Sequence, residues 1–384
     1  MFDFDFQNPV RLVFGRGRHK RIGELIKPFA GRVLLHYGGG SIKRCSTYGD
    51  IISSIEAAGI EYIELGGVRA NPELGLVNEG ARLCREHGVG LILAVGGGSV
   101  IDSAKGIAIG AVPENGDVWK YFTDGGPISG ALPIATVLTI PAAGSEQSPD
   151  TVISHQDRKL GYSSQKLRPV VSVINPELFF TLPPCQIANG VSDMMSHIME
   201  RYFTNTTHTE LIDGLCESTL RTIMGNGPRL LENPEDYDAW AEVSLAGSFC
   251  HNGFLGVGRE QDWACHDMEH ELSAVDPGIA HGAGLAVITP AWMDYVRSAN
   301  TDMFSRFACN VMGVGDITRA IEKLRRFYRA MGLPSSITEL GLDGGVLDEM
   351  ARKCTQAPDG GAGTIGGLRK LGRDDVLAIY KAAL

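Results

Sequence analysis

The chain has 384 residues, of which 43% are hydrophobic and 21% are charged, a balance typical of soluble globular enzymes. Its formal net charge of −10 disfavours nucleic acid or an anionic membrane surface as the main partner. Its apolar runs fall short of the ~18 residues that a membrane span needs. Because the length exceeds that of most single hydrophobic cores, we expect two domains.

Apolar runs alternate with helical patterns in the first third of the chain. Short apolar runs predict strands over residues 33–35, 62–65, 90–95 and 132–136. Longer segments between them predict helices over residues 47–58, 74–87 and 100–110. Strands and helices that alternate with short loops are typical of a doubly wound parallel sheet.

The pattern changes near residue 181, where the sequence TLPP interrupts the chain. Beyond it, periodic apolar segments predict helices over residues 186–204, 208–224, 236–251, 262–272 and 317–331. We expect the glycine-rich segment 358–363 to be a surface turn. The sequence thus predicts an α/β dinucleotide-binding domain over residues 1–181 and an all-α domain over residues 182–384.

The cysteines and the N-terminus both indicate a cytoplasmic protein. The eight cysteines are scattered and form no C-x-x-C pair, which favours reduced thiols over a disulfide framework. Residues 1–17 lack the basic-then-apolar order of a secretory signal peptide.

The tetrapeptide GGGS occurs twice, at Gly38–Ser41 and at Gly96–Ser99, each time after an apolar strand. Glycines let the backbone approach an anion closely, and the helix after the second loop would point its N-terminal amides at a phosphate. Asp102, in the first turn of that helix, either caps it or meets a ribose. The alternative is that both loops are plain strand-to-helix turns, since the G-x-G-x-x-G fingerprint is absent.

The first loop also indicates a cofactor preference. An NAD-specific site usually carries an acid that bonds the ribose 2′-hydroxyl. The strand end before Gly38 has no acid, whereas Ser41, Lys43 and Arg44 follow the loop and can receive a 2′-phosphate. We therefore expect NADP(H) in preference to NAD(H), unless Lys43 and Arg44 are only solvated helix charges.

Two short segments of the second domain carry the residue types of a metal site. Asp193 and His197 are four residues apart, so on a helix they share one face. His266 and His270 have the same spacing, and His281 follows shortly afterwards. A carboxylate with several imidazoles suits Fe²⁺ or Zn²⁺. Spacing alone leaves open which of the three later histidines bind, and either pair can instead be structural.

Together these motifs resemble the iron-containing (group III) alcohol dehydrogenase family over nearly the whole chain. The resemblance rests on NPVRLVFGRG at 8–17, GGGSVIDSAK at 96–105, LTIPAAGSE at 138–146, LPP at 182–184, the Asp193/His197 segment and the His266–His281 segment. The stretch YGGGS at 37–41 is similar to the NADPH-dependent aldehyde reductase and butanol dehydrogenase branch.

The resemblance implies a ligand set and a set of cofactor contacts. The metal ligands would be Asp193, His197, His266 and His281, with His270 beside the metal and near the nicotinamide without binding the ion. The dinucleotide would lie against Gly38, Gly39, Gly40, Ser41, Asn71, Gly96, Gly97, Gly98, Ser99, Asp102, Thr139 and Lys159. The fold would be that of the dehydroquinate synthase-like and iron-containing alcohol dehydrogenase proteins, and the enzyme would be a homodimer.

The function expected is hydride transfer between NAD(P)H and a small aldehyde or primary alcohol. The metal would polarise the carbonyl oxygen, and His270 would relay a proton or, alternatively, only orient its neighbours. One rival is an NAD-dependent polyol dehydrogenase of the glycerol type. A dehydroquinate-type synthase should carry a cationic cluster for a substrate phosphate, but the sequence near Asp193 and His266 has no such cluster. A dinucleotide sensor would need no metal. Both alternatives therefore rank lower.

Overall fold

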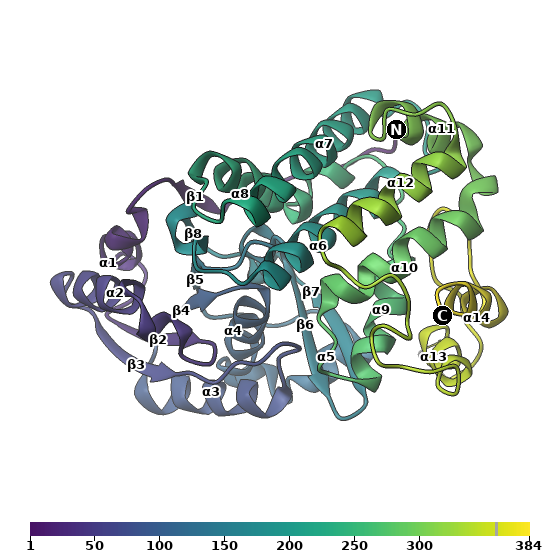
Figure 1. Ribbon diagram of the computed structural model, residues 1–384. Coiled ribbons are helices and arrows are strands. Elements are labelled where there is room, and N and C mark those ends of the chain that lie inside the picture. The colour runs from purple at the N-terminus through teal and green to yellow at the C-terminus, as the bar shows by residue number, and fades with distance from the viewer. Residues whose placement is uncertain (358–359) are drawn as a thin grey trace. The chain divides into compact units, whose positions relative to one another are not determined.

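One parallel sheet of six strands organises the first part of the chain in the computed structural model, which describes residues 1–357 and 360–384 (Figure 1). The order across the sheet is β1–β8–β5–β4–β2–β3. The strands are β1 (Arg11–Phe14), β2 (Arg32–Tyr37), β3 (Glu61–Leu65), β4 (Leu91–Gly96), β5 (Ile134–Leu138) and β8 (Val171–Ile174). The parallel α/β sheet expected from the alternating pattern is therefore confirmed.

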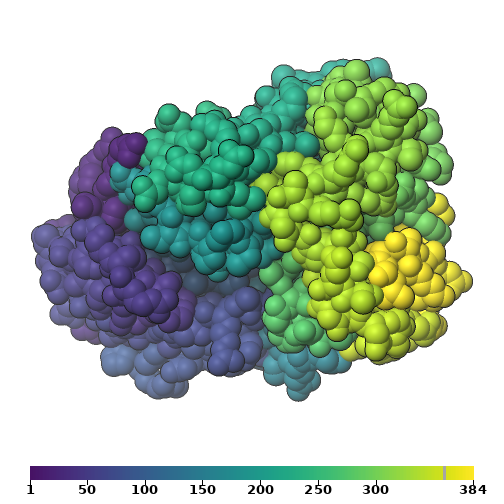
Figure 2. Space-filling model, viewed as in Figure 1, coloured from purple at the N-terminus to yellow at the C-terminus, as the bar shows by residue number. Residues whose placement is uncertain are grey.

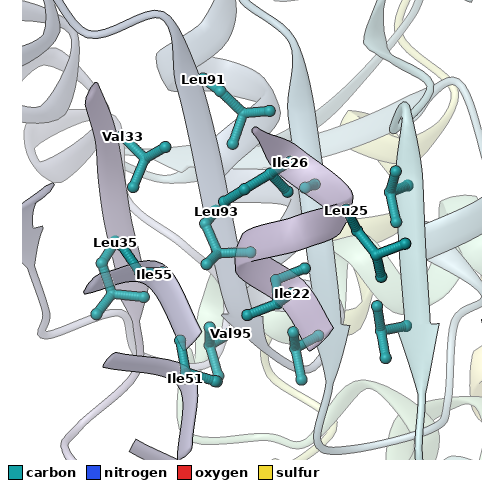
Figure 3. Packing of buried hydrophobic residues seen from close by; sticks show 14 of the residues in the cluster. Ile22, Leu25, Ile26, Val33, Leu35, Ile51, Ile55, Leu91, Leu93 and Val95 are labelled. Atoms are coloured by element: carbon teal, nitrogen blue, oxygen red, sulfur yellow. The ribbon is translucent and has the colours of Figure 1, made fainter. Parts of the chain in front are cut away.

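The central strands are apolar on both faces, as strands covered on both sides must be. On one face, α1 (Ile22–Ile26) and α2 (Ser46–Ala57) bury isoleucines and leucines against β2 and β4 (Figure 3). Alternate residues such as Leu34 and Ile92 point to the other face. There α4 (Gly98–Gly110) packs on β4 and β5, and α3 (Leu74–His87) packs on α4.

Both glycine-rich loops lie at the same edge of this sheet. β2 and β4 are hydrogen-bonded neighbours with Tyr37 opposite Val95, so the loops that follow them start side by side. The carboxyl edge of a parallel sheet is where such folds bind ligands. An antiparallel hairpin, β6 (Asp150–His155) and β7 (Arg158–Ser163), packs on α4.

The second half of the chain is helical. The longer helices are α6 (Pro184–Tyr202), α7 (Glu210–Glu232), α8 (Tyr237–His251), α9 (Ala264–Val275), α10 (His281–Val296), α11 (Thr301–Asn310), α12 (Ile317–Ala330), α13 (Leu347–Cys354) and α14 (Arg373–Ala382). α6 packs on α7 and α10, and α10 packs on α9. Figure 2 shows the C-terminal residues, in yellow, at the surface. Among the described residues, no helix has the length and apolar character of a bilayer span.

The chain groups into two compact units. The α/β unit holds residues 7–182 and 234–244, and the helical unit holds residues 1–6, 183–233 and 245–384. Two segments thus differ from the predicted division at residue 181. The Met1 amine donates to the Thr207 carbonyl over 2.6 Å, which ties the N-terminus to the helical unit. Trp240 packs on Phe179, which ties the start of α8 to the α/β unit.

Residues 1–6 and 234–244 join their units through contacts between residues far apart in the chain. The change of composition near residue 181 does not reveal such contacts. Four strands, β1, β6, β7 and β8, and several helices, notably α10, were also not predicted. Pro358 and Asp359, which begin the predicted surface turn, lie outside the described residues.

Candidate metal centre and dinucleotide site

Three helices of the helical unit present the four histidine and aspartate side chains singled out in the sequence. Asp193 and His197 lie one turn apart on α6, His266 lies in the first turn of α9, and His281 is the first residue of α10. α6 packs on both other helices, and α9 packs on α10. The structure therefore brings together residues that are up to 88 positions apart (281 − 193).

The donor atoms converge on one carboxylate oxygen. Asp193 Oδ1 lies 3.2 Å from His197 Nε2, 3.9 Å from His266 Nε2 and 4.0 Å from His281 Nε2. The Nε2 atoms of His197 and His266 are 3.3 Å apart. Ligands about 2.0–2.1 Å from a tetrahedral metal ion lie roughly 3.4 Å from one another. The spacing of these four atoms fits one ion at their centre.

The electrostatics of Asp193 fit a cation as well. Oδ1 is buried and has no hydrogen-bond partner of good geometry among the described residues, an arrangement that costs free energy unless a cation compensates it. Burial by itself would raise the Asp193 pKa. The neighbouring imidazoles of His197, His266 and His281 outweigh burial and hold that pKa well below its usual value. Asp193 is therefore an ionised carboxylate, as a metal ligand must be.

Two fully buried carboxylates stand behind the histidines. Glu200 bonds Nδ1 of His266, and Glu269 bonds Nδ1 of His281. Metal-binding histidines commonly donate their second ring N–H to a carboxylate, which fixes the tautomer and the ring orientation. Both Nε2 atoms are thereby left to face Asp193.

Each carboxylate is itself held in place. Glu200 Oε1 accepts from the backbone N–H of Cys265 at 2.7 Å and of His266 at 3.2 Å. A Cβ at residue 284 would lie 2.7 Å from Glu269 Cγ, so Gly284 leaves room for this carboxylate. Sequence reasoning missed both glutamates. The available signal was their position three residues after His197 and His266, one turn along each helix.

The pKa values of two histidines move in opposite directions. Burial and the nearby His266 and His251 rings lower the His197 pKa well below its usual value, so this ring is neutral. Its Nδ1 lies 3.0 Å from Nδ1 of His251. Burial also acts to lower the pKa of His266, but the charges of Glu200 and Asp193 outweigh it and raise that pKa to about 9. Metal binding at His266 would therefore release a proton.

His270 lies beside this cluster on α9. Its ring centroid is 5.6 Å from that of His281. Among the described residues, donor atoms of Asp193, His266 and His281 form one group that can hold a metal, and those of Glu269, His270 and His281 form another. The first group, with His197 next to it, is the one whose carboxylate reaches all three imidazoles.

The α/β unit carries the residues expected to bind a dinucleotide. α4 begins at Gly98, and no side chain of the described residues caps the backbone N–H groups at the positive end of its dipole. A Cβ on Gly97 would lie 2.9 Å from Ile140, so a larger residue would disturb the loop. Thr139, at the end of β5, donates its backbone N–H to the Gly96 carbonyl over 3.0 Å and therefore lies against the second loop.

Asn71 and Lys159 are both buried, and the hairpin of β6 and β7 brings the segments that carry them together. Asn71 has a φ of 55°, a left-handed conformation that asparagine tolerates. Ser154, opposite Lys159 in the hairpin, donates its N–H to the carbonyl of Pro72 over 2.8 Å. The segment around Asn71 and the β6–β7 hairpin, more than 80 residues apart in the chain, thus lie side by side in the α/β unit.

Asp102 has structural partners on both carboxylate oxygens. Ser145 donates its hydroxyl to one oxygen at 2.6 Å, and the Val152 N–H donates to the other at 3.1 Å. Asp102 therefore joins α4 to β6, and its contact with a ribose remains a prediction. Lys43 is also partnered, by Glu64 at 2.7 Å.

Comparison with known proteins finds relatives of both halves of the chain. The family model described as iron-containing alcohol dehydrogenase matches residues 9–176, and the model of the C-terminal region of that family matches residues 187–384. The chain is 41% identical to NADH-dependent butanol dehydrogenase A of Clostridium acetobutylicum, with 99% of each chain covered. It is 36% identical to the NADPH-dependent aldehyde reductase YqhD of Escherichia coli, with 92% of this chain and 93% of that one covered.

A solved structure is similar over the full length. NADH-dependent butanol dehydrogenase A of Thermotoga maritima superimposes with a TM-score of 0.95 at 40% identity, covering 100% of this chain and 99% of that one. The two family models together span almost all of the residues described above. The chain belongs to the iron-containing alcohol dehydrogenase family.

Proposed function

We propose that this enzyme transfers a hydride between NAD(P)H and a small aldehyde or the corresponding primary alcohol, at one divalent metal ion. The observation that carries the proposal is the convergence of three imidazole nitrogens on Asp193 Oδ1. The named activities of the relatives, butanol dehydrogenase and aldehyde reductase, support the substrate class.

The metal ligands we propose are Asp193, His197, His266 and His281. One carboxylate with three imidazoles suits Fe²⁺ or Zn²⁺, and the family name favours iron. When bound, such an ion acts as a Lewis acid toward the carbonyl oxygen of the substrate. Glu200 and Glu269 keep two of the ligand rings turned with Nε2 inward.

His270 is our candidate for proton transfer. Its ring stands next to His281, while the compact group around Asp193 is made of other residues. An imidazole can accept or donate a proton near neutral pH. We propose that His270 supplies a proton to the oxygen of the product alcohol, directly or through water.

The dinucleotide is proposed to lie against the two glycine loops with Asn71, Asp102, Thr139 and Lys159. The two loops and Thr139 follow neighbouring strands at the carboxyl edge of the sheet, where such folds bind ligands. We propose NADP(H) as the preferred cofactor, since Ser41, Lys43 and Arg44 are exposed beside the first loop. Relatives named as NADH-dependent and as NADPH-dependent are both similar to this chain. A homodimer in the cytoplasm is the setting we propose.

The test is metal analysis combined with oxidation of NADPH and NADH across a panel of aldehydes. We expect one metal ion per chain and turnover with small aldehydes. His266→Ala should lose the metal and the activity, whereas His208→Asn, at an exposed histidine of the same unit, should keep both. Full metal occupancy without turnover of any aldehyde would refute the proposed function.

A further inference from the structure

Four side chains form a closed cluster beside the first glycine loop: Tyr37, Lys43, Tyr48 and Glu64, called here the Glu64 cluster. Lys43 Nζ donates to Glu64 Oε2 at 2.7 Å, and the Tyr37 hydroxyl donates to the same oxygen at 2.8 Å. The Tyr48 hydroxyl donates to Glu64 Oε1 at 2.6 Å. The Glu64 carboxylate therefore binds the Lys43 ammonium, which carries the positive charge of the cluster.

Strand pairing places Glu64 next to the loop. β3 pairs with β2 so that Glu64 is opposite Leu35 and Leu65 is opposite His36. Just beyond the strands, the Gly67 N–H donates to the Gly38 carbonyl over 2.9 Å. A side chain at residue 66 would clash with the Tyr37 ring at 2.5 Å, so Gly66 lets the two strand ends close together.

The end of β3, where Glu64 lies, corresponds to a position that often contacts the cofactor in dinucleotide-binding folds. An acidic residue at the end of the strand that follows the glycine loop and its helix commonly faces the ribose 2′-hydroxyl of the adenosine. Glu64 occupies that position, one strand later than the segment around Gly38 in which no acid is found. The sequence did not reveal it because the register of β3 against β2 is a tertiary property.

The charges of the cluster balance. Lys43 Nζ lies 4.9 Å from the centre of the Tyr37 ring and 4.8 Å from that of Tyr48, so both rings add to its stabilisation. The hydrogen bond to Glu64 raises the Lys43 pKa, and the same carboxylate raises the Tyr48 pKa to about 12. Lys43 is thus cationic and Tyr48 neutral, and the cluster holds one positive and one negative charge.

We propose that Glu64 is a specificity-determining residue that weakens discrimination in favour of NADPH by neutralising Lys43. A 2′-phosphate at this loop meets an ion pair in place of a free ammonium, and the carboxylate repels it. A ribose 2′-hydroxyl experiences neither effect strongly. The inference rests on the proposed function in one respect, that the adenosine end of the cofactor lies against Gly38–Ser41.

The test compares Glu64→Gln with the wild type. Glutamine keeps an oxygen acceptor and nearly the same shape but loses the negative charge. A unit charge near a phosphate dianion at a hydrated surface changes affinity by about tenfold. We expect the ratio of NADP⁺ affinity to NAD⁺ affinity to rise about tenfold, with a similar rise in the kcat/KM ratio for NADPH over NADH. Glu56→Gln, an equal charge change at an exposed site on α2, should leave both ratios unchanged.

The partner variant tests the route through Lys43. Lys43→Met should weaken NADP⁺ binding about tenfold while changing NAD⁺ binding by less than threefold. In the double variant Glu64→Gln/Lys43→Met, the gain from Glu64→Gln should be smaller than with Lys43 present, because only the direct repulsion between the carboxylate and the phosphate is then removed. A ratio that stays within twofold of wild type in Glu64→Gln, or that falls, would overturn the proposal.

Equilibrium binding separates this inference from the proposed function. If the metal-loaded enzyme reduces no aldehyde but Glu64→Gln still shifts the binding ratio, the proposed reaction fails and the role of Glu64 stands. If turnover proceeds and the ratio does not move, the role of Glu64 fails and the reaction stands.

Discussion

The carboxylate of Glu200 bonds Nδ1 of His266, while Nε2 of the same ring faces Asp193. Glu200, which is neither a proposed metal ligand nor a proposed cofactor contact, thus fixes the orientation of the His266 ring. Glu269 repeats the arrangement at His281. Two of the three histidines of the candidate metal centre therefore have their tautomer set by a buried glutamate.

Replacing Glu200 by Gln should weaken metal binding about 10- to 100-fold, because an amide no longer enforces the tautomer with Nε2 free. Glu269→Gln should act in the same direction through His281. Metal titration of the stripped protein measures both effects, and Glu232→Gln, at an exposed site on α7, is the matched control. Wild-type metal affinity in both buried variants would show that these glutamates serve folding alone.

Removing the metal should abolish activity and lower stability together. A ligand that binds the folded state alone contributes about 3 to 4 kcal/mol at 100 to 1,000 times its dissociation constant. We expect a chelator to lower the thermal midpoint and Fe²⁺ or Zn²⁺ to restore it. Asp193→Asn should show no such metal-dependent shift, whereas Asp302→Asn, at an exposed aspartate, should behave as wild type. An equal shift in Asp193→Asn would contradict its role as a ligand.

His36 should make the α/β unit sensitive to acid. Its Nδ1–H donates to the Leu65 carbonyl at 2.8 Å and its Nε2 accepts from Ser103 at 2.9 Å, so the buried ring is neutral. Burial lowers its pKa from 6.5 to about 4. As the pH falls below 6.5, the unfolded state binds a proton that the folded state does not, and stability is lost down to about pH 4.

Denaturant unfolding at two pH values tests this. Between pH 7.5 and 5, wild type should lose about 2 kcal/mol more unfolding free energy than His36→Gln, which has no group to titrate there. Titrations elsewhere in the chain are common to both proteins and cancel. Identical losses in the two proteins would show that the His36 pKa is not depressed in the folded state.

His270→Phe should lower kcat by about 100-fold and remove one ionisation from the pH profile, because a proton donor near the product oxygen is lost. Metal content should stay at the wild-type level, which separates a proton-transfer role from a ligand role. An unchanged pH profile would exclude His270 from proton transfer.

The sequence predicts many of the helices and strands but not how they pack against one another. Apolar runs located β2 and β4, and the spacing of Asp193 and His197 predicted one helix face, as α6 has it. α10 was not predicted, because residues 282–296 are apolar nearly all round and contain Pro290, so they show no amphipathic period. Since His281 begins α10, its approach to Asp193 follows from helix packing that spacing does not encode.

Anomalous diffraction from crystals of the metal-loaded protein tests the central claim most directly. We predict one peak per chain, within about 2.0 to 2.3 Å of a carboxylate oxygen of Asp193 and of Nε2 of His197, His266 and His281. A peak bound by Glu269, His270 and His281 instead, or no peak in active protein, would contradict the assignment.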